Sequence, residues 1–233
     1  MGRIASFHLV RERPRRGAGA MARLATDRPS LTRADGLAWF RLLGTGRGSA
    51  TTPGADLRRT ALLALWDDDD ALDRFLAAHP IVRRWSEAEE VYGVRLRSLG
   101  GHGSWGGRDL LEAMVPGDGA GPVAVVTRAV VRPTHWRTFA RATHPVDLEL
   151  RGTDGLLAVC GIGEVPVGRQ ATFSLWRSWV AASTFAYAGA AHRDVVARTR
   201  AEGWYGEELF ARFQPYGSTG TWDGVDPLAA VAP

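Results

Sequence analysis

The sequence predicts an α+β fold in which two ferredoxin-like repeats, each ordered strand, helix, strand, strand, helix, strand, pair their sheets into one closed barrel. Three observations predict it: short motifs recur in the two halves, each half has the same order of elements, and a turn-rich stretch separates them. The length of 233 residues suits one large domain or two small ones.

The repeat is visible as matched motifs. Residues 61–66 end in Leu-Trp, as do residues 171–176, and a phenylalanine follows each tryptophan by nine positions. A histidine behind two alanines, a tyrosine and a Gly-Ser/Thr-Trp tripeptide come next in both copies. The matched residues are Trp66 and Trp176, Phe75 and Phe185, His79 and His192, Tyr92 and Tyr205, Trp105 and Trp222, with Gly44-Thr45-Gly46 matched to Gly161-Ile162-Gly163.

The elements follow in the same order in both copies. In the first, a helix is expected after aspartates 67–70, because carboxylates stabilise a helix N-terminus. The other elements predicted there are strand 4–10, helix 15–25, strands 37–43 and 60–66, and strand 92–99. The second copy has strand 123–131, a helix near 135–142, strands 156–161 and 171–176, a long helix over 179–202 and strand 208–214. We therefore expect repeats at 1–115 and 123–222, a linker at 116–122 and a disordered tail at 223–233.

Composition excludes several classes of protein. The hydrophobic fraction of 45% and charged fraction of 23% are typical of a globular chain, and no apolar run reaches the ~18 residues of a spanning helix. The 29 basic residues are all arginine, spread among 25 acidic ones, which argues against nucleic-acid binding and leaves at most a peripheral membrane contact. A single cysteine, Cys160, excludes an internal disulfide and points to the cytoplasm.

One histidine stands out as a candidate ligand. His192 lies on the predicted buried face of the long second-copy helix, along the line Phe185, Ala188, His192, Val195 or Val196, and Thr199. A buried imidazole must hydrogen-bond or bind a metal, so a satisfied core histidine and a metal ligand both remain open. The aromatic residues that crowd this copy can be core, or they can wall a flat macrocycle or a long polyene.

Longer strings then carry a family resemblance. Residues 161–176, the pair Ala191-His192 and residues 200–213 resemble the spheroidene monooxygenase (carotenoid oxygenase) family of the haem-binding dimeric α/β-barrel superfamily. The resemblance runs from near Phe7 to near Trp222. It implies that the two repeats form a dimeric-α/β-barrel-type fold, in agreement with the repeat itself. It also implies haem b, with its iron, as cofactor and insertion of oxygen into a carotenoid or another apolar substrate in pigment or specialised metabolism.

The resemblance also suggests site residues. In related haem barrels the axial histidine lies on a helix of the C-terminal unit, which here fits His192. Beside the haem we expect Phe173, Trp176 and Phe185. The polar residues Arg128, Gln170 and Ser174 are the candidates for orienting O2 or a substrate heteroatom, although each can equally be an ordinary strand residue.

Three functions remain open at this point. A monooxygenase needs an electron donor. A haem-dependent dehydratase or N–N bond-forming enzyme of the aldoxime-dehydratase type acts on an N-hydroxylated substrate without net oxidation. A non-catalytic barrel binds haem or a hydrophobic ligand reversibly. A closed two-copy barrel needs no partner to cover its edges, and a homodimer is also common for such barrels.

Overall fold

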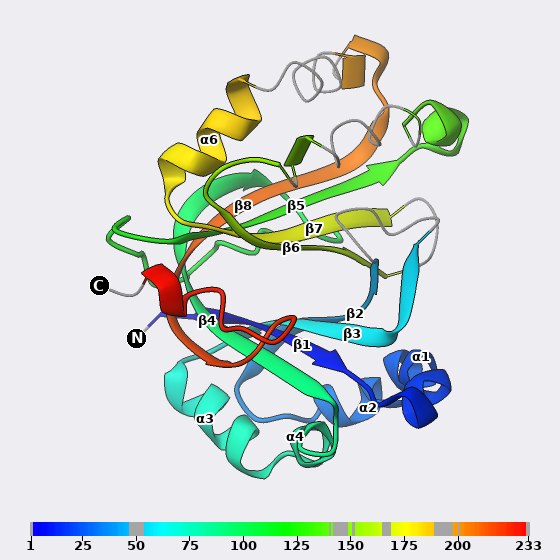
Figure 1. The fold of residues 1–233 in the computed structure, drawn as a ribbon, viewed down its shortest axis with the longest axis vertical. Coiled ribbons are helices and arrows are strands. Elements are labelled where there is room, and N and C mark those ends of the chain that lie inside the picture. Colours follow the sequence, from blue (N-terminus) through cyan, green and yellow to red (C-terminus); the bar gives the residue numbers. More distant parts are fainter. Residues whose placement is uncertain are drawn as a thin grey trace.

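Eight antiparallel strands close into one barrel, which Figure 1 shows between two groups of helices. The computed structural model describes residues 2–46, 54–139, 141, 149–150, 152–164, 169–188, 198–199 and 201–231. The strand order around the barrel is β1-β3-β2-β6-β7-β5-β8-β4. The strands are β1 Ile4–Arg11, β2 Leu37–Gly46, β3 Ala55–Trp66, β4 Glu90–Gly103, β5 Val123–Val131, β6 Leu156–Gly163, β7 Arg169–Trp176 and β8 Tyr205–Gly220.

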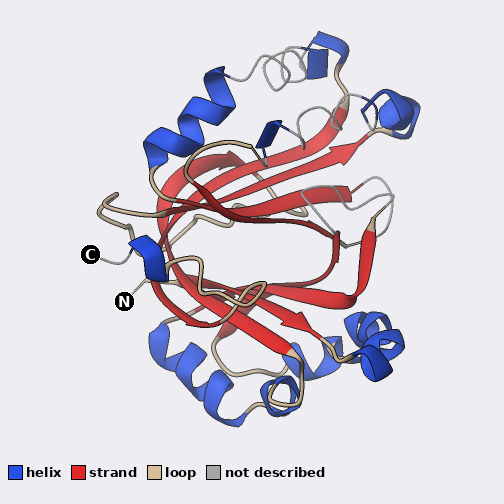
Figure 2. Cartoon of the chain, viewed as in Figure 1, coloured by secondary structure: helices blue, strands red, loops and turns tan. Residues whose placement is uncertain are grey.

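Each half of the barrel is a ferredoxin-like sheet, as predicted. The order is β4-β1-β3-β2 in the first repeat and β8-β5-β7-β6 in the second. Helices lie at two opposite ends of the molecule with the strands between them (Figure 2). The first repeat carries α1 Gly17–Thr26, α2 Arg28–Leu31, α3 Asp69–Ala78 and α4 Pro80–Trp85, and the second carries α6 Trp179–Ala188. Short 3-10 turns lie at Pro14–Arg16, Pro133–His135 and Ala229–Val231.

Two seams of unequal length join the sheets. Strands β4 and β8 pair along most of their length, from Tyr92 opposite Gly220 to Gly103 opposite Leu209. The other seam is short, with Gly44 opposite Gly163 and Thr45 opposite Ile162. Closure in this way leaves neither repeat with an open sheet edge.

Aromatic side chains fill the barrel interior. The rings of Phe7 and Phe173 stack with centroids 3.8 Å apart and planes 7° apart, and the Trp222 ring lies about 6 Å from both. Because successive strand residues point to opposite faces, the neighbours of Phe7 and Phe173 in sequence point out toward the helices. The interior of the barrel is therefore a packed core shared by both repeats.

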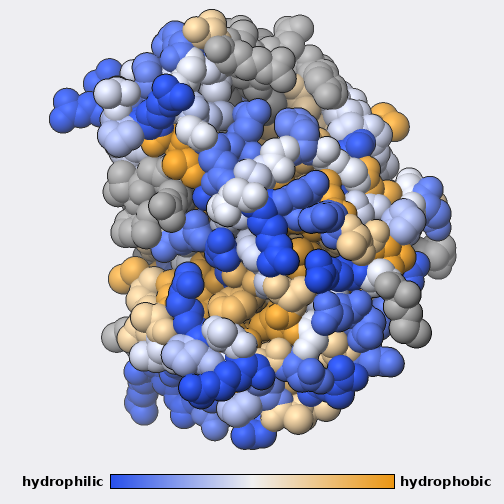
Figure 3. Space-filling view, turned by 180° about the vertical axis from the view of Figure 1, so that it is seen from behind, coloured by the Kyte–Doolittle hydropathy of each residue, from blue (hydrophilic) through white to orange (hydrophobic). Residues whose placement is uncertain are grey.

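The outer surface mixes hydrophilic and hydrophobic areas. Seen from behind, hydrophilic side chains cover most of the molecule, while hydrophobic ones gather across its middle and lower parts (Figure 3). No helix among the described residues is both long enough and apolar enough to cross a lipid bilayer.

Strand pairing gives the alignment of the two repeats position by position. Ile4 faces Trp66 just as Val123 faces Trp176, so these pairs are equivalent. The same comparison corrects two of the motif matches. Gly44 is equivalent to Gly163 and not to Gly161, and Tyr92 is equivalent to Leu209 and not to Tyr205. The predicted match had placed the glycines two positions, and the tyrosines four positions, out of register.

The Gly-Ser/Thr-Trp tripeptides form loops that cross from one repeat to the other. The Glu207 carboxylate of β8 accepts hydrogen bonds from Ser104 Oγ and the Gly107 amide, both at 2.8 Å. In the other direction, Glu90 of β4 accepts from Thr221 Oγ1 at 3.0 Å and from the Gly224 amide at 2.7 Å. Each loop buries its tryptophan, Trp105 or Trp222, in the barrel interior. The two repeats are thus tied together reciprocally.

The C-terminal segment differs from the expected disordered tail. Asp223 forms ion pairs with Arg11, at 2.5 Å, and with Arg59. Leu228 packs against the barrel core, and Asp226 accepts a hydrogen bond from Ser218. The prediction of disorder is therefore wrong for residues 223–231. The error arose because low-complexity composition carries no trace of these long-range contacts.

The reciprocal loops predict sensitivity to acid. Burial alone raises the pKa of Glu207, but hydrogen bonds from Gly107, Ser104 and Arg128 outweigh it and lower the pKa to about 2. Because the folded state holds this carboxylate ionised, its stabilisation is complete above about pH 5 and is lost as the pH falls toward 2. Glu207→Gln should therefore cost about 1–2 kcal/mol at pH 7, allowing for solvent screening, and less at pH 3.

Urea denaturation at pH 7, 5 and 3 checks this expectation. Glu208→Gln changes an exposed neighbouring carboxylate and serves as the matched control. Equal losses of stability for the two variants at pH 7 would contradict a special role for Glu207.

Candidate functional site

The helix-facing side of the second sheet carries two separate apolar clusters. The α6 cluster contains Val123, Val125, Leu150, Trp176 and Ala182, with Trp179, Phe185 and Phe210 packed against it. The Trp204 cluster contains Ala129, Val131, Phe139 and Trp204, with Trp136 and Tyr205 against it. On β5 the residue between the two clusters on this face is Thr127, whose hydroxyl lies 2.6 Å from that of Thr172 on β7. We call these two residues the threonine pair.

The centre of this face carries smaller side chains than its counterpart in the first repeat. There a single continuous cluster, which includes Leu42, Leu62 and Phe75, packs between the sheet and the helices. The equivalent positions, first repeat before second, are Phe40 and Val159, Leu42 and Gly161, Leu62 and Thr172, His8 and Thr127, and Val10 and Ala129. At one equivalent position the second repeat has the larger side chain, Phe210 in place of Gly93. The centre of the second sheet's helix-facing side, called here the floor, therefore carries smaller and more polar side chains at these five positions than the first sheet does.

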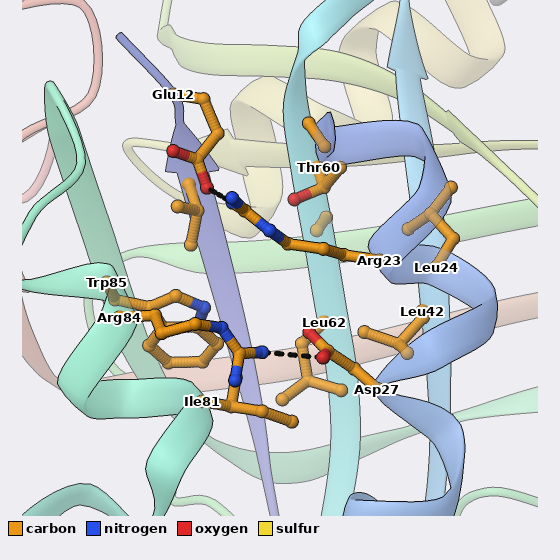
Figure 4. Close-up of a pocket in the computed structure, with 13 residues that line it drawn as sticks. Glu12, Arg23, Leu24, Asp27, Leu42, Thr60, Leu62, Ile81, Arg84 and Trp85 are labelled. Atoms are coloured by element: carbon orange, nitrogen blue, oxygen red, sulfur yellow. Dashed lines mark hydrogen bonds and ion pairs between the residues drawn. The ribbon is translucent and has the colours of Figure 1, made fainter. Parts of the chain in front are cut away.

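The first repeat closes its own cleft with ion pairs. A space of about 450 Å³, part of it open solvent, lies between α1, α4 and the sheet, and Figure 4 shows the residues that line it. Arg23 of α1 pairs there with Glu12, and Arg84 of α4 pairs with Asp27 at 2.5 Å. Leu42 and Leu62 lie on its floor. In the second repeat the same positions are Gly161 and Thr172, and much of the chain around them lies outside the described residues.

Two of the predicted site residues point into the barrel and away from the helix-facing side. Phe173 is fully buried in the Phe7 stack. Arg128 stands opposite Ala171, an interior position, with its guanidinium 2.6 Å from Glu207 and 3.6 Å from Glu164. The same guanidinium lies over the Trp105 ring, 4.9 Å from its centroid. Arg128 is thus part of the contact between the repeats.

Four others lie on the helix-facing side. Ser174 Oγ accepts a hydrogen bond from Trp176 Nε1 at 2.9 Å and donates a long one, 3.4 Å, to the Val125 carbonyl. The Trp176 ring lies 5.7 Å from that of Phe185 on α6. Gln170 is on the same face of β7 and is partly buried. In the first repeat Ser6 Oγ likewise accepts a hydrogen bond from Trp66 Nε1. One role of Ser174 is therefore to orient the Trp176 ring.

His192, the predicted ligand, lies outside the described residues, which extend to Ala188 and resume at Arg198. Within the described part of the chain, no group of three or more histidine, cysteine or carboxylate side chains is placed to hold a metal ion. The part of the site that the structure does describe is its floor and the α6 wall.

Sequence reasoning missed Gly161, Thr127 and Thr172. Gly161 and Thr172 lie within the string 161–176 that carries the family resemblance, but nothing in that string marks them as site residues. What distinguishes these three residues is a difference between the repeats. They have small or hydroxyl side chains at the positions where the first copy has Leu42, His8 and Leu62. That difference can be read only once the register is known, and the motif match at Gly161 was two positions out of register.

Solved structures share this fold. The chain resembles an aldoxime dehydratase crystallised with butyraldoxime, with a TM-score of 0.64 and 9% identity, covering 92% of this chain and 79% of that one. A second aldoxime dehydratase structure gives a TM-score of 0.57 at 12% identity, covering 91% of this chain and 81% of that one. At such low identity the likeness concerns the fold alone, a two-repeat α+β barrel.

Sequence comparison is more specific. No protein-family model matches this chain. It is 33% identical over 195 residues to the spheroidene monooxygenase of Rhodobacter capsulatus, covering 82% of this chain and 81% of that protein. The Rubrivivax gelatinosus spheroidene monooxygenase is 35% identical over 193 residues, covering 81% and 73%. A third, from Cereibacter sphaeroides, is 35% identical over 195 residues, but the match spans only 59% of its length. The chain belongs to the spheroidene monooxygenase family.

Proposed function

We propose that this chain is a haem-dependent monooxygenase that inserts an oxygen atom into a carotenoid or a similar long apolar substrate. Its family makes it an oxidoreductase of the monooxygenase class, and the relatives are named for a carotenoid, spheroidene. The observation that carries the proposal is the floor of small and hydroxyl side chains on the second sheet, flanked by aromatic clusters. We place the haem, and the reacting end of the substrate, between this floor and α6.

The residues of this face fit a haem. A flat macrocycle needs apolar walls and a floor of small side chains. Here Trp176 and Phe185 pack together as a wall, and Gly161 and Thr172 are smaller than Leu42 and Leu62 at the equivalent positions. His192 would hold the haem iron in this proposal, as the resemblance suggests. When bound, the haem iron supplies the chemistry that activates O2.

The chain's own residues position the reactants. Ser174 is held by Trp176 and retains an acceptor lone pair, while the threonine pair and Gln170 add polar atoms on the same floor. These groups orient O2 or a polar end of the substrate. The apolar clusters on either side exclude water and hold the hydrocarbon part. Arg128 and Phe173 act from the barrel side of the sheet, as support for its position and not as contacts to the reactants.

The haem proposal is tested by ultraviolet–visible spectra of the protein expressed with haem supply. We expect a Soret band in the parent that is lost or shifted in His192→Ala. The matched control is His79→Ala, the histidine behind two alanines in the first repeat, which interacts with Ser30 and caps α4. It should keep the parent spectrum. A parent that binds no haem overturns the proposal, and an unchanged spectrum in His192→Ala overturns that ligand.

Turnover then separates the reaction classes. With spheroidene, O2 and an electron donor, the haem-loaded protein should yield products that contain added oxygen. Anaerobic, redox-neutral conversion of an aldoxime, without oxygenation of spheroidene, would favour the dehydratase class. Reversible exchange of haem or ligand with no turnover under either condition would favour a binding protein.

A further inference from the structure

The two repeats begin their second helices with the same local structure. The Asp67 amide donates to the Gly36 carbonyl at 2.9 Å, and the Arg177 amide donates to that of Gly155 at 2.8 Å. Asp68 then caps α3 by accepting from the Ala71 amide, just as Ser178 caps α6 by accepting from Ala181. Helices α3 and α6 can therefore be compared residue by residue.

That comparison shows a reversal of surface character. The positions held by Asp67, Asp69, Asp70, Asp73 and Arg74 in the first repeat are held by Arg177, Trp179, Val180, Ser183 and Thr184 in the second. Four carboxylates and an arginine have become one arginine, two apolar residues and two hydroxyls. None of the ten residues of α6 is charged, and Val180 is 72% exposed.

Equivalent arginines beside these two helices also have different partners in the two repeats. In the first repeat Arg95 of β4 pairs with Asp69, at 2.7 Å, and with Asp73. Its equivalent on β8 is Arg212, whose guanidinium lies over the Trp179 ring, 4.5 Å from the centroid. No carboxylate in the described part of the chain pairs with Arg212 or Arg177. The two positive charges therefore remain available to an external anion.

We propose that this corner of the molecule, made of Arg177, Trp179, Val180 and Arg212 and called here the α6 corner, docks onto an anionic lipid surface. A tryptophan and an exposed aliphatic side chain beside arginines without carboxylate partners combine an apolar contact with a positive charge, which suits the boundary of an anionic membrane. Each arginine near an anionic surface strengthens binding roughly fivefold in such systems. In Figure 1, α6 and the acidic α3 lie at opposite ends of the barrel, so one end of the molecule is suited to lipid and the other is not.

A second copy of the chain fits this corner less well. A symmetric contact between two α6 corners would bring their arginines together. A head-to-tail contact would need the carboxylates of α3, of which Asp69 and Asp73 are already paired with Arg95. The charge pattern thus favours lipid headgroups. This inference rests on the comparison of repeats and does not depend on the proposed cofactor or reaction.

Co-sedimentation with vesicles tests the proposal. The parent should bind phosphatidylcholine vesicles that contain about a third phosphatidylglycerol, and bind phosphatidylcholine alone at least about tenfold more weakly. High salt should reduce the binding. Val180→Asp gives α6 the residue that α3 has there, at an exposed position, and should weaken binding by about tenfold or more.

The double variant Trp179→Asp with Val180→Asp should abolish binding, because it also gives Arg212 the carboxylate partner that Asp69 gives Arg95. Asp70→Val on α3 is the mirror-image control and should leave vesicle binding unchanged. Circular dichroism and thermal melting confirm that each variant is folded. The proposal is overturned if the parent does not bind anionic vesicles, or if Val180→Asp and the double variant bind them as well as the parent does. So does sedimentation velocity in which Val180→Asp abolishes a self-association of the parent, since the partner is then a second copy.

Discussion

Phe173→Ala is expected to lower the free energy of unfolding by about 3–5 kcal/mol, the range for removing a buried phenylalanine from a well-packed core. The side chain is fully buried, stacks on Phe7 at 3.8 Å and contacts Trp222, and these three residues come from both repeats. Loss of the ring leaves a cavity at the centre of the barrel. Urea denaturation monitored by circular dichroism measures the effect.

The control for this variant lies on the other face of the same sheet. Phe185 is half-buried against Trp176 on the helix side, so Phe185→Ala should cost less stability and should weaken haem binding instead. Under conditions where Phe173→Ala is folded, its haem affinity should match that of the parent. A loss of less than about 1 kcal/mol for Phe173→Ala, or a selective loss of haem, would contradict its assignment to the barrel core.

Thr172→Leu is expected to reduce the affinity for haem by at least about tenfold, because it refills the floor of the proposed site. The substitution introduces the residue that the first repeat has at this position, Leu62, and it breaks the threonine pair. A leucine is therefore compatible with the sheet itself. Haem titration followed at the Soret band measures the change.

The reverse substitution in the first repeat completes the comparison. Leu62→Thr puts a hydroxyl into a continuous apolar cluster and should cost about 2–3 kcal/mol of stability without changing haem affinity. If Thr172→Leu binds haem as tightly as the parent does, the proposal that haem lies against Thr172 and Gly161 is wrong.

Much of the fold could be predicted from the sequence because the same motifs and the same order of elements occur in both halves of the chain. The order of the strands, the helix after aspartates 67–70 and the closure of two sheets into a barrel are confirmed. The helices predicted near 135–142 and over 179–202 lie partly outside the described residues. The register was harder, because Gly44 and Gly46 invite a match with Gly161 and Gly163 that is two residues off. Only cross-strand pairing, a long-range property, distinguishes the two alignments.

The candidate site shows where reasoning from sequence ends. Strand alternation already separates Phe173 from Ser174 and Trp176, so these residues could not all line one pocket. Tertiary packing decides which face of the sheet the helices cover. It also places Arg128 beside Glu207, with which it forms an ion pair. The helix-side residues Gln170, Ser174, Trp176 and Phe185 remain together in the proposed site. His192 stays a prediction.

The reciprocal tryptophan loops have a consequence for the history of the chain. A single repeat carries both a donor loop and an acceptor carboxylate, Ser104 to Gly107 and Glu90 in the first, Thr221 to Gly224 and Glu207 in the second. Two identical copies of such a half have everything needed to clasp one another about a twofold axis. The present chain reads as that homodimer fused into one gene. After fusion the two halves no longer had to be identical, so one could keep an acidic helix while the other acquired an uncharged helix and a floor of smaller side chains.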